Sequence, residues 1–155
     1  MITVGKIKEK FYRDAVEEYT RRLSRYCKLD IVEVADEKTP DNASEAENQK
    51  ILSREGDRIL SRIRDNTYVI TLAIKGQMLD SVELSKQLDI LSVSGKSDIT
   101  FIIGGSLGLD SRVDKRADFS LSFSRMTFPH QLMRVILLEQ IYRAFRISAN
   151  EPYHK

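Results

Sequence analysis

The 155-residue chain has little of what marks an unusual protein class. Its one cysteine, Cys27, excludes an internal disulfide and is typical of a protein in a reducing cytosol. Seven glycines and three prolines are too few for a disordered or low-complexity chain. No apolar run is long enough to span a membrane, and no signal peptide precedes the first element. We therefore expect a single cytoplasmic domain over residues 1–155, with no membrane contact.

The chain also lacks a strong net charge. Twenty-five Lys and Arg against 23 Asp and Glu leave a formal charge of +2, too small for a general polyanion binder. Basic side chains do gather around the first predicted helix, at Lys6, Lys8, Lys10, Arg13, Arg21, Arg22 and Arg25. Acidic residues are interspersed among them, so we interpret this face as solvated rather than as an RNA-binding surface.

What is present is a regular alternation of two periodicities. Apolar residues recur every second residue, or in short continuous runs, at 2–4, 29–34, 68–74, 99–103 and 119–123. Helical spacing occupies 11–26, 44–64, 81–91, 111–116 and the segment that follows Pro129, with 36–43 as a loop. The order β-α-β-α-β-α-β-α-β-α predicts an α/β fold, a mostly parallel sheet flanked by helices.

Three of the predicted strands end in segments that suit a ligand site. These segments are 72–76, 104–108 and 123–128, rich in glycine, serine and apolar side chains and nearly free of carboxylates. In parallel sheets, ligands lie beyond the carboxyl ends of the strands. We expect a flat heterocycle there, held by backbone groups between apolar walls. The glycine run 104–108 is neither a dinucleotide fingerprint nor a phosphate-binding loop, and a simple tight turn is the alternative.

The last predicted helix carries two polar residues where its pattern is apolar. His130 and Arg134 fall on the same side as Leu137, Leu138 and Ile141, and unpaired polar groups in such a stripe cost free energy. They indicate a site, although a hydrogen-bonded structural histidine and an arginine paired with a carboxylate across a subunit interface are equally compatible with the spacing. Neither His130 nor His154 has zinc-ligand spacing to another histidine or a cysteine, so we expect no metal.

Several motifs resemble those of one family. They are ITLAIKG at 70–76, FIIGGSLG at 101–108, LSFSRMTFPHQ at 121–131, EQIYRA at 139–144 and PYHK at 152–155. Together they resemble the bacterial ribosomal RNA large subunit methyltransferase H family, of the SPOUT class, over essentially the whole chain. Members of that family usually carry a few more residues before the VGK motif at 4–6.

The resemblance implies an activity, a topology and an assembly. Family members transfer a methyl group from S-adenosylmethionine to N3 of a pseudouridine in 23S ribosomal RNA on the assembled ribosome. The resemblance also implies a trefoil knot in the C-terminal third of the chain and a two-fold homodimer built on the last helix. That helix is apolar almost all the way round, which agrees with a buried dimer contact.

The resemblance also assigns site residues. The cofactor contacts would be Leu72, Gly104, Phe123, Ser124, Arg125, Met126, Thr127 and Phe128. Arg134 could stabilise a developing uracil anion or hold a phosphate, and His130 and His154 could each accept the N3 proton. We expect Arg134 and His154 to position the substrate and leave the proton acceptor unassigned. Tyr153 would position the substrate base, in a tail, 151–155, that reaches the cofactor pocket of a partner chain.

Two other function classes remain open. One is a non-catalytic RNA- or ribosome-binding module that keeps the same α/β shell. The other is an enzyme acting on a small nucleotide at the same strand ends. The combination of the glycine-rich strand ends with Arg134 and the 151–155 tail favours the transferase.

Overall fold

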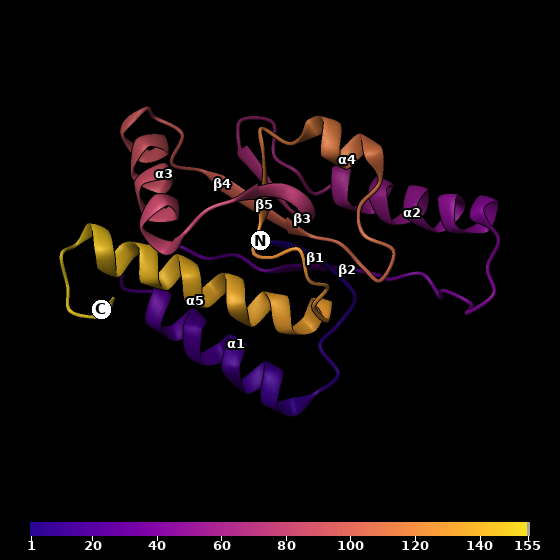
Figure 1. Ribbon diagram of the computed structural model, residues 1–155, viewed down its shortest axis with the longest axis horizontal. Coiled ribbons are helices and arrows are strands. Elements are labelled where there is room, and N and C mark those ends of the chain that lie inside the picture. The colour runs from indigo at the N-terminus through magenta and orange to yellow at the C-terminus, as the bar shows by residue number, and fades with distance from the viewer. Residues whose placement is uncertain (155) are drawn as a thin grey trace.

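A computed structural model describes residues 1–154 and contains one five-stranded sheet in the order β2-β1-β4-β3-β5 (Figure 1). All neighbouring strands are parallel, which confirms the predicted α/β class. The strands are β1 (Ile2–Val4), β2 (Val32–Val34), β3 (Tyr68–Met78), β4 (Ile99–Ile103) and β5 (Phe119–Ser122).

Helices cover both faces of the sheet and divide the core in two. The first layer contains α1 (Lys10–Leu23), α3 (Ser81–Val93) and α5 (His130–Ser148), and the second contains α2 (Glu45–Leu60) and α4 (Ser111–Arg116). Ile70 and Leu121 face the α5 layer, whereas Val69 and Ile102 face the other. The strands therefore present apolar side chains to both faces, as expected of a buried parallel sheet.

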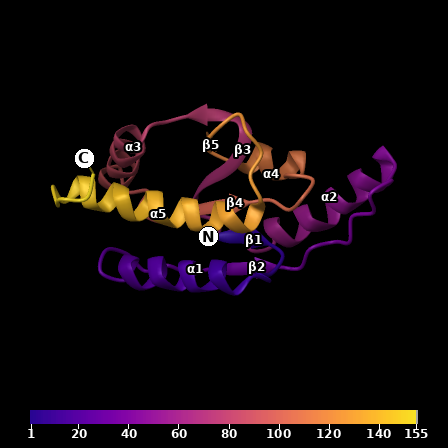
Figure 2. The same cartoon turned by 60° about the horizontal axis from the view of Figure 1, so that its bottom comes forward.

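Helix α5 is the centre of the larger layer. It packs between α1 and α3, as Figures 1 and 2 show, and its residues Leu137, Leu138 and Ile141 are buried against the sheet. The helix begins at His130, so Pro129 occupies the position before the first turn rather than within it. Proline suits this position because its missing N–H would have no intrahelical partner.

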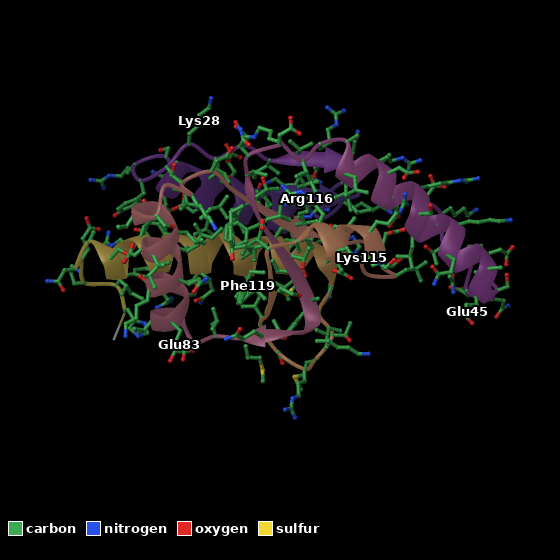
Figure 3. The ribbon with its side chains drawn as sticks, turned by 90° about the horizontal axis from the view of Figure 1, so that it is seen from above. Lys28, Glu45, Glu83, Lys115, Arg116 and Phe119 are labelled. Carbon is green, nitrogen blue, oxygen red and sulfur yellow. The ribbon has the colours of Figure 1, made fainter. Side chains whose placement is uncertain are left out.

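Helix α2 is shorter than the predicted 44–64 because its last residues form a tight turn. Arg62 N–H donates to Ile59 O over 2.9 Å, a three-residue spacing that ends the α-helical ladder. At the other end the side chain of Ser44 caps the helix, and Glu45 lies at the tip that projects from the body (Figure 3). Gly56 also has a packing role, since a Cβ there would lie 2.7 Å from Asp110 Cβ.

Two strand boundaries differ from the sequence prediction. β3 continues to Met78 because Leu121 of β5 pairs with both Leu72 and Gln77, so residues 73–76 form a bulge. Gly76 permits this, since a Cβ there would lie 2.7 Å from the Ser120 carbonyl oxygen. β2 begins only at Val32, because β1 starts at Ile2 and offers residues 29–31 no strand to pair with. The first helix likewise ends at Leu23 rather than at 26.

Candidate functional site

The three strand ends selected from the sequence meet around one cavity of about 750 Å³. Its walls are the β3 bulge, the glycine run 104–108 and the segment 121–129, and the first turn of α5 closes it. The segments converge because the parallel strands β3, β4 and β5 end at the same edge of the sheet. Of the expected contact residues, seven line the cavity: Leu72, Gly104, Phe123, Ser124, Met126, Thr127 and Phe128. Arg125 is exposed and is not among the lining residues.

The glycine run is a loop that folds back on itself. A Cβ on Gly104 would lie 2.3 Å from the carbonyl oxygen of Gly108, a collision of backbone with side chain. Gly108 adopts φ of 88° and its N–H donates to the Gly105 carbonyl over 3.1 Å. Glycine is therefore required at 104 by the loop itself. A larger residue at 104 would therefore displace the loop backbone as well as narrow the cavity.

Serine hydroxyls connect the walls of the cavity. The hydroxyl of Ser122 lies 3.0 Å from the carbonyl oxygens of both Ile74 and Ser124. The Met126 N–H donates to the Ser124 hydroxyl over 3.0 Å. These bonds fix the segment after β5 against the β3 bulge, although Met126 itself is 72% exposed.

His130 lies at the rim of the cavity, half-buried in the first turn of α5. Burial lowers the pKa of its imidazole, the nearby Arg134 and Lys8 lower it further, and Asp36 opposes them. The neutral ring is therefore favoured at neutral pH, and a neutral imidazole can accept a proton. This was one of the two histidines that the sequence offered as a proton acceptor.

Arg134 does not line the cavity. Its side chain is 1% exposed, and its Nη1 donates to Glu33 Oε1 over 2.8 Å. Its Nη2 donates to the carbonyl oxygens of Val4 and Gly5, at 2.7 and 2.8 Å. The sequence left open a pairing with a carboxylate across an interface; the carboxylate is in the same chain. Arg134 thus holds together α5 and the carboxyl ends of β1 and β2.

The C-terminal tail follows the carboxyl end of α5 (Figure 1), whereas the cavity is lined by residues of the first turn of that helix and by none of the described tail residues. The Tyr153 ring packs edge-on to Tyr142 at 5.1 Å, and its hydroxyl donates to Glu139 Oε1 over 3.2 Å. Burial, more than the nearby carboxylate, raises the pKa of Tyr153 to about 12. His154 is exposed, and Lys155 lies outside the described residues. One chain therefore does not bring the tail and the cavity together.

A second cavity, of about 890 Å³, lies at the opposite, amino edge of the sheet. It is lined by Leu29, Ile31, Ile99 and Phe101, among other residues. Although larger, it has no glycine loop and lies away from the carboxyl ends of the strands, so we take the 750 Å³ cavity as the candidate functional site.

Within residues 1–154, no three His, Cys, Asp or Glu side chains gather as metal ligands would. None of the helices described there combines the length and the apolar character that crossing a membrane needs.

A family model described as predicted SPOUT methyltransferase matches residues 1–154. Full-length relatives agree with it: the ribosomal RNA large subunit methyltransferase H of Clostridium botulinum is 63% identical, and that of Bifidobacterium adolescentis is 62% identical. Each alignment covers 100% of this chain and 98% of the relative. The chain belongs to the ribosomal RNA large subunit methyltransferase H family. Membership in this family, a SPOUT methyltransferase family, implies the knot that the resemblance placed in the C-terminal third of the chain.

The SPOUT fold also relates the chain to more distant proteins. A solved structure of a probable methylase family protein from Haemophilus influenzae matches with a TM-score of 0.52 and 14% identity. The match covers 99% of this chain and 69% of that one. At this identity the similarity concerns the fold alone.

Proposed function

We propose that the protein transfers a methyl group from S-adenosylmethionine to N3 of a pseudouridine in 23S ribosomal RNA, on assembled ribosomes in the cytosol. The observation that carries the proposal is the cavity at the carboxyl edge of the sheet, built from the three motif-bearing segments. Its relatives are named as methyltransferases of large-subunit ribosomal RNA.

The residues of the cavity fit S-adenosylmethionine. Its volume lies within the range of about 300–1,000 Å³ that is usual for small-molecule sites. Leu72, Leu109 and Phe123 offer apolar walls for an adenine ring, while the glycine loop offers peptide groups at close range. Asp114 is the only carboxylate among the lining residues of this cavity. The positive charge of the sulfonium would therefore not be held by several salt bridges. S-Adenosylmethionine, when bound, supplies an electrophilic methyl group on a sulfonium.

The chain's own residues would align the reactants and accept a proton. Methyl transfer is an in-line displacement that depends on orientation and on exclusion of water. We propose that neutral His130, at the cavity rim, accepts the N3 proton of the base as the N–C bond forms and the bond between the methyl carbon and the sulfonium sulfur breaks, leaving a neutral thioether. Arg134 then acts as a positioning residue, because Nη1 and Nη2 of its guanidinium already donate to Glu33 and to two carbonyl groups.

A homodimer is part of the proposal. Ile74, Met78 and Met126 are 50%, 52% and 72% exposed, on β3 and on the loop after β5. Covering such apolar side chains stabilises association, at about 25 cal/mol per Å² buried. In a two-fold dimer, Tyr153 and His154 of one chain would complete the cavity of the other, so that each site comes from two chains.

Methyl incorporation tests this function against the two alternatives. Ribosomes that lack the modification are incubated with the protein and radiolabelled S-adenosylmethionine, with free 23S RNA and free nucleosides as parallel substrates. We expect label in ribosomes, and calorimetry should show S-adenosylmethionine binding. Binding to ribosomes without incorporation favours the non-catalytic module, and labelling of free nucleosides favours the small-nucleotide enzyme.

A further inference from the structure

The basic residues around α1 do not form one uniform solvated face. Arg21 and Arg22 each pair with Glu18 at 2.7 Å, and Lys10 pairs with Asp14 at 2.6 Å. The charge of α1 is therefore largely compensated along the helix itself. For Lys10, Arg21 and Arg22, this agrees with the solvated face that the sequence indicated.

Lys6 and Lys8, in the connection from β1 to α1, lack such acidic partners, as do Arg13 and Arg25 within the described residues. Both lysines are exposed, and neither forms an ion pair with any residue of the described part of the chain, 1–154. Their backbone is nevertheless fixed: Lys8 N–H donates to Gln131 Oε1 over 2.9 Å, and Arg13 donates to the Lys8 carbonyl over 2.6 Å. A rigid backbone presents two free ammonium groups here, an arrangement that costs little further ordering when an anion binds.

This connection lies beside the proposed methyl-transfer site. Gln131, which binds the Lys8 backbone, follows His130 at the cavity rim, and Arg134 binds the carbonyl of Gly5. Figures 1 and 2 both show the β1–α1 connection next to the first turn of α5. The charge of Lys8 also lowers the pKa of His130, after burial and Arg134. Whatever Lys6 and Lys8 bind therefore lies close to the reacting base.

An exposed aromatic ring completes this surface. Phe11, in the first turn of α1, is 62% exposed, and its ring centroid lies 4.2 Å from that of Tyr12. Lysines interleaved with an exposed ring are typical of surfaces that bind single-stranded RNA, where bases stack on the ring and ammonium groups contact phosphates. A protein partner with an acidic surface would use the lysines but would not need the ring.

We propose that Lys6, Lys8 and Phe11, here called the basic-aromatic patch, bind the ribosomal RNA strand that flanks the target nucleotide. Lys6 and Lys8 contact backbone phosphates, and an unpaired base stacks on Phe11. The inference rests on the proposed function for the identity of the RNA. The inference explains how a chain with a net charge of only +2 binds a polyanion. Lys6 and Lys8 place two uncompensated positive charges beside the site.

The test compares two double variants of equal charge. K6Q/K8Q removes the patch lysines, and K50Q/K86Q removes exposed lysines of α2 and α3, for which residues 1–154 also provide no ion pair. Binding to ribosomes is followed by co-sedimentation over a series of salt concentrations, alongside methylation kinetics. The slope of log affinity against log salt is negative, and the loss of two phosphate contacts should make it less steep by about 1.4 to 1.8. The control variant K50Q/K86Q should keep the wild-type slope. KM for ribosomes should rise, and S-adenosylmethionine affinity should stay at the wild-type value.

Phe11→Ala tests the stacking contact, with Phe11→Trp as the conservative variant. Loss of one stacked base should weaken ribosome binding about tenfold, and Trp should restore it. Light scattering of F11A is recorded as well, because dissociation of the dimer would make Phe11 a subunit contact and overturn its role.

The failures of the two proposals are distinguishable. Equal salt slopes for K6Q/K8Q and wild type overturn the basic-aromatic patch, whether or not methyl transfer occurs. Absence of methyl transfer by the wild-type protein overturns the proposed function, while co-sedimentation still tests the patch.

Discussion

The guanidinium of Arg134 donates to the carboxylate of Glu33 over 2.8 Å and thereby ties α5 to β2. The pair is unequally buried, since the side chain of Arg134 is 1% exposed and that of Glu33 is 36% exposed. The arginine also satisfies the carbonyl groups of Val4 and Gly5, where β1 ends. Its removal would leave two buried acceptors unsatisfied, whereas Glu33 alone could be solvated.

We expect Arg134→Met to lower the free energy of unfolding by about 3 kcal/mol, as for other buried pairs that lose one partner. Glu33→Gln should cost about 1 kcal/mol, because a partly exposed pair is screened by water. Urea denaturation measures both. Arg116→Met is the control, because its contact with Asp118 is 3.5 Å long and the two side chains are 34% and 40% exposed. Equal stability of R134M and wild type would contradict the role of Arg134 as a structural clamp.

The glycine loop predicts a contrast between two alanine substitutions. Gly104→Ala places a Cβ 2.3 Å from the Gly108 carbonyl oxygen, so the loop must move and S-adenosylmethionine affinity should fall more than tenfold. Gly108→Ala meets no atom within 4 Å and pays only for its φ of 88°, about 1–2 kcal/mol of stability. Calorimetry and thermal denaturation separate the two effects. Wild-type affinity in G104A would move the cofactor away from this loop.

Glu55 predicts a pH dependence of stability. Its side chain is 4% exposed beneath Gly105, its Oε1 accepts from Glu37 N–H at 2.9 Å, and burial raises the pKa of the carboxyl above its usual 4.5. The folded state thus binds this proton more tightly than the unfolded state. The ionised Glu55 carboxyl therefore lowers the free energy of unfolding, and it does so fully at neutral pH. This destabilisation diminishes as the pH falls through the pKa of the folded state and is gone below about 4.5.

Glu55→Gln keeps an acceptor for Glu37 N–H and removes the ionisation. We expect this variant to match or exceed wild-type stability at neutral pH. It should also lose the part of the stability gain that wild type shows between neutral and mildly acidic pH. Urea midpoints at several pH values measure this. Identical pH profiles for E55Q and wild type would mean that the buried carboxyl does not titrate abnormally.

Deletion of residues 153–155 should separate cofactor binding from methyl transfer. Tyr153 packs on Tyr142, so its loss should cost about 1 kcal/mol of stability. S-Adenosylmethionine affinity should be nearly unchanged, because none of the described tail residues lines the cavity of its own chain. Methylation of ribosomes should be abolished, as radiolabel incorporation would show. Incorporation near the intact rate would leave the tail without a role in the site.

A mixed dimer provides the control for that deletion. The tail-deleted chain and the G104A chain are each expected to be inactive. Their heterodimer contains one intact cavity facing one intact tail, so activity should return to about half of the wild-type level if the sites are shared between chains. Light scattering first verifies that both parents are dimers.

The sequence predicted the sheet and the location of the cavity because these depend on local signals. Apolar runs that stop at glycine and serine mark strand ends, and parallel strands bring such ends to one edge. It did not predict that Glu33 pairs with Arg134, 101 positions away along the chain. Nor did it reveal the requirement for glycine at 104, which depends on the backbone of Gly108. Periodicity says which face a residue occupies but does not name its partner.

The central claim is the transfer of a methyl group to N3 of a pseudouridine. Its most direct test is mass spectrometry of nucleosides from 23S RNA, after unmodified ribosomes react with the protein and S-adenosylmethionine that carries a deuterated methyl group. The account predicts a single deuterium-labelled nucleoside, 3-methylpseudouridine, formed by wild type and absent with G104A. Label in another nucleoside, or no labelled nucleoside in RNA from ribosomes that the protein binds, would contradict it.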